Sequence, residues 1–207
     1  GKNWKKVTAG MPEGMLGRIG LSFPRKNPNM VVATIEASIP NASAAAGEWR
    51  RTATGGTFLS SNKGDSWKKV NNLNPRPFYF SMPRFDTQDD KRIYVFGVNA
   101  HLSEDQGTTF RVMPINNRVH VDYHAAWINP NDNNHMIVGN DGGVYQSRDK
   151  GNTWEHLNTM DIGQFYAIGY DFRKPYYIYG GLQDNNSWGG PTQSRHANGV
   201  GFWNWFT

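Results

Sequence analysis

The segment His120-Val121-Asp122-Tyr123-His124 concentrates chemically active side chains. Successive residues of a strand point to opposite faces, so a strand here would place His120, Asp122 and His124 on one face. Two imidazole nitrogens and a carboxylate are ligand types that bind zinc and similar metals. A metal site would need a fourth ligand from elsewhere in the chain, and a hydrogen-bonded polar lining is the simpler alternative. The segment is therefore either a candidate metal site or a hydrogen-bonded polar lining.

A second candidate segment runs from Gly181 to Trp188 and is rich in amide side chains. Asp184 could supply an acid, and Trp188 could supply a flat platform for a sugar ring. Asn and Asp side chains also stabilise turns, which is the simpler account of this composition. A glycosidase needs two carboxylates at a defined separation, and Asp122 and Asp184 are only weak catalytic candidates. None of the five glutamates stands out as an acid, so the sequence assigns no active site.

The composition predicts many short strands that would position these groups. The 207 residues include 8 Trp, 9 Tyr, 11 Phe and 23 Gly, so large flat side chains alternate with turn-forming residues. The absence of cysteine excludes disulfides and thiolate chemistry. The net charge of +5 is scattered rather than gathered on one basic face, so we expect no nucleic-acid partner. No apolar run is long enough to cross a bilayer, and we expect no transmembrane segment.

A turn motif occurs three times, with its first residues 43 and 44 positions apart. We call the three copies the repeat turns, and their pattern is Ser-x-Asp/Asn-x-Gly-x-Ser/Thr-aromatic. The defining residues are Ser60, Asn62, Gly64, Trp67, Ser103, Asp105, Gly107, Phe110, Ser147, Asp149, Gly151 and Trp154. In such a turn the Asp or Asn accepts hydrogen bonds from its own loop, Gly takes a positive φ, and the aromatic ring packs beneath. These structural roles explain the motif without catalysis.

A fixed period of this length predicts an all-β fold, a partial β-propeller of four-stranded blades. Apolar runs that each follow a polar turn are predicted to form the second strand of a blade. These runs are 30–35, 92–97, 135–139 and 176–180. The first strands of blades line the central channel of a propeller, so their polar residues are candidates for ligand contact.

Counting back from the polar turns places Tyr79, Asp122 and Gln164 in equivalent positions, two residues before Ser81, His124 and Tyr166. Polar and aromatic rows of this kind make a funnel that could hold a sugar or a peptide. They could equally be an ordinary lining of the channel. The ligand-binding candidates are Tyr79, Asp122, His124, Gln164, Tyr166 and Trp188.

The repeat also predicts the blade boundaries, all within one propeller domain. We expect the end of a preceding blade at 1–7, blades at 8–70, 71–113 and 114–157, and an incomplete blade with two strands at 158–207. Residues 1–7 align with 64–70, so the chain is expected to be a piece of a larger propeller. The first full blade carries an insertion near 37–54, which could form a short helix after Asn41. It is a candidate lid or contact loop, and a tolerated surface excursion is an equally good account.

The repeat turns have the pattern of the Asp-box, or BNR repeat, and the chain resembles bacterial sortilin/VPS10-like Asp-box propeller proteins. That group is often labelled glycosyl hydrolase. The segments VHVDYHAAWINPNDNNHMIVGNDGGVYQSRDKGNTW and IGQFYAIGYDFRKPYYIYGGLQDNNSWGGP carry the resemblance, together with GRIGLSFPRKNPNMVVATIE and PRPFYFSMPRFD. Related propellers include peptide-binding receptors, photosystem assembly factors, xyloglucan-cleaving enzymes and sialidases. The resemblance therefore implies the fold more firmly than the function.

We expect a non-catalytic, exported protein-binding or scaffold propeller, and it could be a subunit of a larger envelope or extracellular assembly. Expected partners are the remaining blades of the same propeller and a protein or peptide, with a glycan as the alternative. The resemblance implies a secreted, periplasmic or cell-surface location, and the residues indicate no cofactor. The alternative function is a polysaccharide-degrading or sialidase-like glycoside hydrolase with part of its catalytic pair outside this chain. Trp188, Trp203 and Trp205 would then be sugar platforms.

Overall fold

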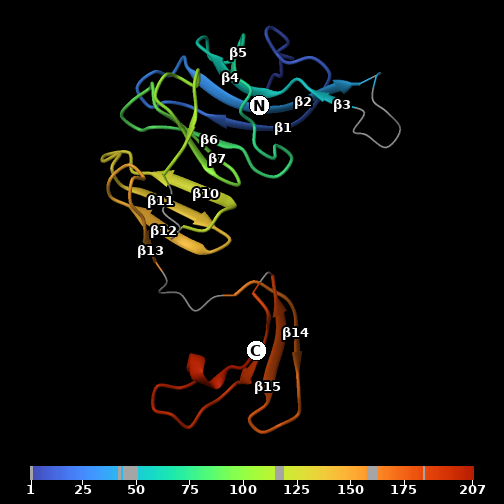
Figure 1. Ribbon diagram of the computed structural model, residues 1–207, viewed down its shortest axis with the longest axis vertical. Helices are drawn as coiled ribbons and strands as arrows, with labels where there is room; N and C mark the ends of the chain where they lie inside the picture. The colour runs from blue at the N-terminus through green and yellow to red at the C-terminus, as the bar shows by residue number, and fades with distance from the viewer. Residues whose placement is uncertain (1, 42, 44–50, 115–118, 158–162, 184) are drawn as a thin grey trace. The chain divides into compact units, whose positions relative to one another are not determined.

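A computed structural model describes residues 2–41, 43, 51–114, 119–157, 163–183 and 185–207 of the chain (Figure 1). These residues form sixteen strands in four antiparallel sheets and one short 3-10 helix, which confirms the predicted all-β class. The described part of the chain has no helix long and apolar enough to cross a membrane. Two compact units are present: unit 1 is Gly1–Asn158 with three of the sheets, and unit 2 is Thr159–Thr207 with the fourth.

The sheets of unit 1 are antiparallel meanders whose four main strands follow one another in chain order, as in a propeller blade. The first contains β1 (Met15–Ser22), β2 (Val31–Pro40), β4 (Gly56–Ser60) and β5 (Lys68–Asn71), with β3 (Arg51–Ala53) paired to the end of β2. The second contains β6 (Met82–Phe85), β7 (Ile93–Phe96), β8 (Ala100–Ser103) and β9 (Arg111–Val112). The third contains β10 (Tyr123–Ile128), β11 (Met136–Asn140), β12 (Gly143–Ser147) and β13 (Glu155–His156).

Apolar side chains between the sheets form the core of unit 1. The second strand β7 is buried on both faces because its side chains alternate between the two neighbouring sheets. Ile93 and Val95 pack in a cluster with Val32 of the first sheet. Tyr94 and Phe96 pack in a cluster that includes Met136 of the third sheet. The sheets of unit 1 therefore stack face to face, which is how the blades of a propeller bury their apolar faces.

The first strands of the three sheets lie side by side, with β6 between β1 and β10. Gly20 of β1 permits the close approach, because a Cβ atom there would lie 2.6 Å from the carbonyl oxygen of Ser81. That oxygen also accepts a hydrogen bond of 2.6 Å from the hydroxyl of Thr34 on β2. The segments that enter these first strands are thereby brought to one end of unit 1.

Part of the predicted insertion near 37–54 is an extension of the first sheet. Strand β2 continues to Pro40, and β3 pairs with it in register, for example Ile39 with Thr52. The helix predicted after Asn41 lies outside the described residues. Residues 2–14 contain no strand, so the segment 2–7 is not part of a sheet in this structure.

Unit 2 is a three-stranded sheet of β14 (Phe165–Tyr170), β15 (Tyr177–Leu182) and β16 (Ser187–Pro191), followed by the 3-10 helix η1 (Phe202–Asn204). The sequence prediction of only two strands here was wrong, because the glycine-containing segment Ser187–Pro191 forms a third strand. Gly189 and Gly190 leave the space for aromatic rings that follow η1: added Cβ atoms would lie 2.6 Å from Phe206 and 2.5 Å from Trp205. Gly189 and Phe206 also exchange two backbone hydrogen bonds of 2.9 Å.

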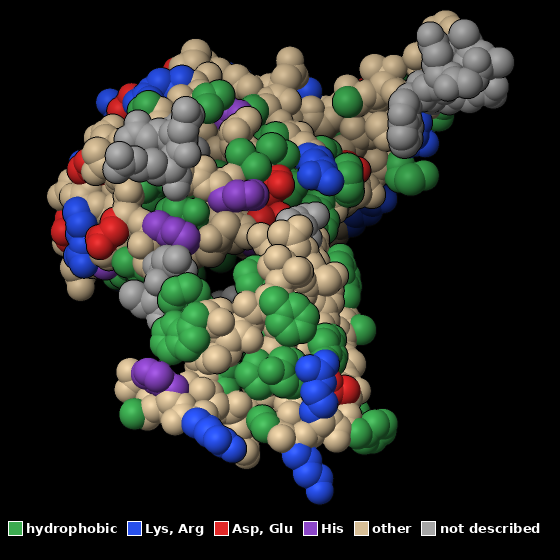
Figure 2. Space-filling view, turned by 60° about the horizontal axis from the view of Figure 1, so that its bottom comes forward, with side chains coloured by type: hydrophobic (Ala, Val, Ile, Leu, Met, Phe, Trp, Pro, Cys, Tyr) green, Lys and Arg blue, Asp and Glu red, His purple; other side chains and the backbone are tan. Residues whose placement is uncertain are grey.

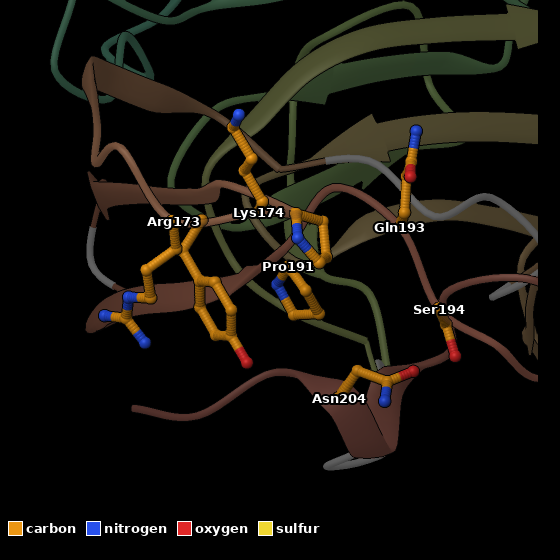
Figure 3. Close-up of a pocket in the computed structure, with 8 residues that line it drawn as sticks. Arg173, Lys174, Pro191, Gln193, Ser194 and Asn204 are labelled. Atoms are coloured by element: carbon orange, nitrogen blue, oxygen red, sulfur yellow. The ribbon is translucent and has the colours of Figure 1, made fainter.

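Both units expose hydrophobic side chains (Figure 2). Unit 2 also contains a cavity of about 480 Å³ beside η1 (Figure 3). The described residues thus offer exposed apolar surface in both units and a cavity in unit 2.

Candidate functional site

A cluster of aromatic and charged side chains lies where the chain enters β6 and β10 and leaves β11. We call it the inner-strand cluster. Its members are Arg76, Phe78, Tyr79, Phe80, Asp122, His124 and Asp141. The antiparallel order of the strands puts the start of each first strand beside the end of the second strand, so these positions share one end of their sheets.

The guanidinium of Arg76 is surrounded by three consecutive rings. Its central carbon is 5.8 Å from the ring centroids of Phe78 and Tyr79 and 5.3 Å from that of Phe80. Phe80 is buried, whereas Phe78 is 65% exposed and Tyr79 is 53% exposed. A guanidinium within about 6 Å of a ring centroid is attracted to the ring face. The cation therefore holds two large rings that remain open to solvent.

The backbone holds these side chains in place through a tight turn before β6. Arg76 and Ser81 have positive φ values of 48° and 66°, and the amides of Tyr79 and Phe80 donate to the carbonyl of Arg76 at 3.1 and 3.0 Å. The guanidinium of Arg18, on β1, donates to the carbonyls of Tyr79 and Phe80, the latter at 2.7 Å. Arg18 of the neighbouring first sheet thus fixes the orientation of the turn that carries Phe78, Tyr79 and Phe80.

Residues of the third sheet complete the cluster. Asp122 Oδ1 lies 3.9 Å from Arg76 Nη1, which is an ion pair without a close hydrogen bond. His124 Nε2 is 2.6 Å from Asp141 Oδ1. The His124 ring also packs edge-on against Tyr79 with the centroids 5.7 Å apart. The cluster therefore joins two sheets through both charge and ring contacts.

The expectation that one strand face aligns His120, Asp122 and His124 was wrong. Strand β10 begins only at Tyr123, and Asp122 has a φ of 64° because the chain turns there while its amide donates to Val98 at 3.0 Å. The Nδ1 atom of His120 is 3.0 Å from the adjacent backbone carbonyl. Within the described residues, no three His, Asp or Glu side chains are placed to hold one metal ion.

The other predicted ligand-binding residues are in unit 2. Tyr166 donates from its hydroxyl to Gln183 Oε1 at 3.0 Å, and Gln164 lies just before β14. Trp188 donates from its ring nitrogen to a carbonyl of its own turn at 2.8 Å. Asp184 lies outside the described residues. The structure thus brings together the three predicted residues of unit 1, and the roles of those in unit 2 stay predictions.

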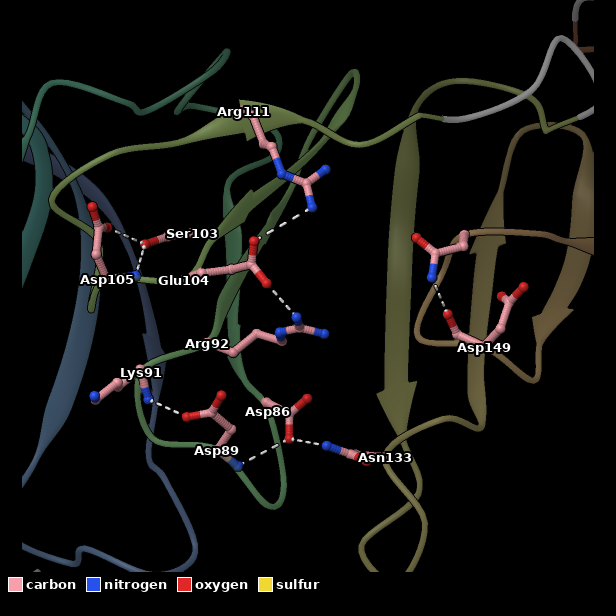
Figure 4. Close-up of polar contacts among 11 residues, drawn as sticks. Asp86, Asp89, Lys91, Arg92, Ser103, Glu104, Asp105, Arg111, Asn133 and Asp149 are labelled. Atoms are coloured by element: carbon pink, nitrogen blue, oxygen red, sulfur yellow. Dashed lines mark hydrogen bonds and ion pairs between the residues drawn. The ribbon is translucent and has the colours of Figure 1, made fainter.

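The repeat turns have the hydrogen bonds expected of structural loops (Figure 4). Asp105 Oδ1 accepts from the Ser103 hydroxyl and the Thr109 amide, both at 2.8 Å, and Oδ2 accepts from the Thr109 hydroxyl at 2.7 Å. Asp149 accepts the same three bonds in the third sheet. The bonds from Thr109 and Ser103 hold the pKa of Asp105 below its usual range. The carboxylates are therefore satisfied within their own turns.

A buried carboxylate links the second and third sheets on the turn between β6 and β7 (Figure 4). Asp86 is fully buried and accepts from Asn133 Nδ2 at 2.8 Å, as well as from the amides of Gln88 and Asp89. Nearby, burial raises the pKa of Tyr94 to about 12, so this phenol stays neutral. Asp86 therefore cross-links the two sheets, and neither Asp86 nor Tyr94 faces solvent.

Sequence reasoning missed Arg76, Arg18 and Asp141 as members or supports of the site. The available signal was the run Phe78-Tyr79-Phe80 in a proline-rich turn, since three consecutive rings cannot all be buried by one short loop. The exposure of Phe78 and Tyr79 and the position of Arg76 depend on packing against the neighbouring sheet. No local sequence pattern specifies that packing.

No protein-family model matches the chain, and no curated protein matches its sequence. Solved β-propeller structures match its fold. The structure described as YCF48 bound to D1 peptide matches with a TM-score of 0.50 at 10% identity, covering 93% of this chain and 57% of that one. The GH74 xyloglucanase from Xanthomonas campestris matches with a TM-score of 0.47 at 11% identity, covering 83% and 29%. YCF48 from Cyanidioschyzon merolae matches with a TM-score of 0.44 at 13% identity, covering 87% and 54%.

The chain spans less than two thirds of the length of each of these structures. At such low identity the similarity shows the fold alone. With the four antiparallel sheets, it establishes that this chain is a partial β-propeller.

Proposed function

We propose that the chain belongs to a non-catalytic, exported Asp-box propeller of the sortilin/VPS10-like kind, and that its inner-strand cluster binds a peptide segment of a protein partner. The observation that carries this proposal is the arrangement of Arg76 against the exposed rings of Phe78 and Tyr79. Tyr and Arg are enriched among the residues that contribute most to protein–protein binding. The exported location is supported by the family resemblance.

The geometry suits a peptide because the turn and its side chains are already ordered before a ligand binds. The turn is already fixed by Arg18 and by its own backbone hydrogen bonds. Phe78 and Tyr79 offer apolar surface, and Arg76 has five N–H donors, more than its distant ion pair with Asp122 uses. A pre-ordered surface of this kind loses less side-chain entropy when a ligand binds.

The propeller fold by itself is compatible with hydrolysis as well as binding. The cluster favours binding, because each of its carboxylates already has a basic partner: Asp122 lies against Arg76, and Asp141 lies against His124. A glycosidase would need one carboxyl group to donate a proton to the substrate and a second to act on the sugar. Hydrolysis is therefore an outcome that the test must be able to detect.

The test selects ligands from a library of random linear peptides and measures their affinity for the whole chain by calorimetry. We expect Tyr79→Ala and Arg76→Ala each to weaken binding by about thirtyfold, which is about 2 kcal/mol and typical of a residue central to an interface. The matched controls are Phe172→Ala and Arg148→Ala, which remove an exposed ring and an exposed cation elsewhere. The controls should bind normally.

Two results would contradict the proposal. One is equal weakening by the cluster variants and their controls, since the cluster would then have no special part in binding. The other is release of reducing sugar ends from a polysaccharide by the unaltered chain, abolished by Asp122→Asn or Asp184→Asn. That result would make the protein a glycoside hydrolase.

A further inference from the structure

The cavity of about 480 Å³ in unit 2 is lined by none of the residues of the inner-strand cluster. Its walls come from the turn between β14 and β15, which supplies Arg173 and Lys174, from Gln193 and Ser194 after β16, and from Asn204 of η1. Figure 3 shows Lys174 and Gln193 extending in the same direction, while Asn204 lies on the opposite side of Pro191. The volume is within the range of about 300 to 1,000 Å³ found for ligand pockets.

The charged residues that line the cavity are both basic. Asp171, nearby in sequence, is engaged by its own turn: it accepts from the Tyr177 amide at 2.9 Å, the Tyr179 hydroxyl at 2.7 Å and Arg173 Nε at 2.5 Å. Desolvation would raise the pKa of Asp171, but these hydrogen bonds outweigh it and lower the pKa to about 2. Arg173 is thus held by a permanent anion, and Lys174 is the lining cation that can turn toward a ligand.

The uncharged lining can recognise a peptide backbone. Gln193 and Asn204 have amide side chains, which pair with peptide N–H and C=O groups. Asn204 Oδ1 accepts from the Gly201 amide at 2.9 Å, so its Nδ2 end is the one that can donate to a ligand. The Tyr177 ring is covered by the Arg173 guanidinium at 4.2 Å, which removes the open aromatic face that a sugar would stack on.

We propose that this cavity binds an acidic peptide segment, with an aspartate or glutamate side chain paired to Lys174 and the peptide backbone held by Gln193 and Asn204. Charge-assisted hydrogen bonds in such pairs are stronger than neutral ones. The site does not depend on the inner-strand cluster, so it stands or fails independently of the function proposed for that cluster.

The experiment measures fluorescence anisotropy of a labelled peptide of alternating glycine and glutamate with the whole chain. A second peptide of the same length has glutamine in place of glutamate. We expect the glutamate peptide to bind at least about tenfold more tightly, equivalent to about 1.4 kcal/mol. Lys174→Gln should remove that preference. The matched control Arg195→Gln removes another exposed cation of unit 2 that does not line the cavity, and it should retain the preference.

Several outcomes would overturn the proposal. Equal binding of the two peptides would show that the carboxylate is not recognised. If Lys174→Gln and Arg195→Gln lost the preference for the glutamate peptide equally, the peptide would be attracted to the basic surface in general and not to the cavity. Full competition by an oligosaccharide of galacturonic acid or by inorganic phosphate, at concentrations equal to the peptide, would assign the cavity to a different class of anion. Circular dichroism of both variants checks that unit 2 keeps its fold.

Discussion

At the scale of single residues, the repeat turns distinguish the contribution of a carboxylate's negative charge from that of its hydrogen-bonding geometry. Asn62 occupies the position of Asp105 and Asp149 in the first turn. Its Oδ1 accepts from the Ser60 hydroxyl and the Ser66 amide at 2.9 Å, and its Nδ2 donates to the Ser66 hydroxyl. The turn geometry is therefore available to a neutral amide, and the carboxylate adds only a charge-assisted acceptor.

This difference predicts the response of the fold to acid. The pKa values of Asp105 and Asp149 are lowered in the folded chain, so their stabilisation is present above the unfolded pKa of about 3.9 and is lost as pH falls through the folded pKa. For Asp149, burial opposes the shift, but the hydrogen bonds outweigh it. The double variant Asp105→Asn, Asp149→Asn should lose less stability than the unaltered chain between pH 6 and pH 3. Urea unfolding midpoints measure this.

The control for the acid experiment is the double variant Asp65→Asn, Asp90→Asn, which removes two carboxylates outside the hydrogen-bonding positions of the repeat turns. This control should lose as much stability between pH 6 and pH 3 as the unaltered chain. An equally steep loss in the repeat-turn variant would show that these two carboxylates do not couple to folding.

At the scale of elements, the apolar runs with a polar turn before them became second strands, as predicted, at β2, β7, β11 and β15. The period of the sequence pattern was enough to predict these second strands, because each of them pairs with strands close to it in the sequence. Strand β16 also pairs with its sequence neighbour β15, but it was missed because its residues carry too weak a pattern. Its two glycines carry no side-chain signal; in the structure the segment pairs with β15, and the rings of Phe206 and Trp205 pack onto the glycines.

A pair of glycine substitutions tests how closely the elements of unit 1 approach. In Gly20→Ala the new Cβ would meet the Ser81 carbonyl oxygen at 2.6 Å, so β1 or the turn before β6 must shift. We expect a loss of roughly 1 to 3 kcal/mol in the free energy of unfolding, the usual cost of overpacking. In Gly169→Ala the Cβ meets nothing within 4 Å. That variant should change stability by less than about 0.5 kcal/mol.

Urea unfolding followed by circular dichroism compares the two glycine variants. A loss of equal size in both would show that the cost comes from the backbone preference of glycine. Gly20 would then have no special role in packing β1 beside β6.

At the scale of the whole molecule, each unit by itself has a first strand that carries exposed apolar side chains. Strand β14 exposes Tyr166, Ile168 and Tyr170, and β1 exposes Ile19 and Leu21. Contiguous apolar surface of this kind promotes association. The chain by itself is therefore expected to self-associate as its concentration rises.

Sedimentation velocity over a series of concentrations tests this expectation. Ile168→Lys with Tyr170→Lys should shift the chain toward the monomer, because two charges interrupt the apolar face of β14. Phe172→Lys is the control: it removes a highly exposed ring from the turn after the strand. If that control reduces association as much as the strand variant, added charge alone is the cause.

The amino-acid sequence determined the all-β class, the repeat turns and the second strands, because each depends on hydrogen bonds and side-chain alternation within a short stretch of chain. Only the tertiary structure decided the inner-strand cluster. Arg76 and Asp122 come from turns in different sheets, and they meet because β6 packs between β1 and β10. The positive φ of Asp122 ends the alternation that predicted a metal site, since the chain turns there before β10 begins. Contacts of that kind arise from the packing of sheets, and no period in the sequence specifies them.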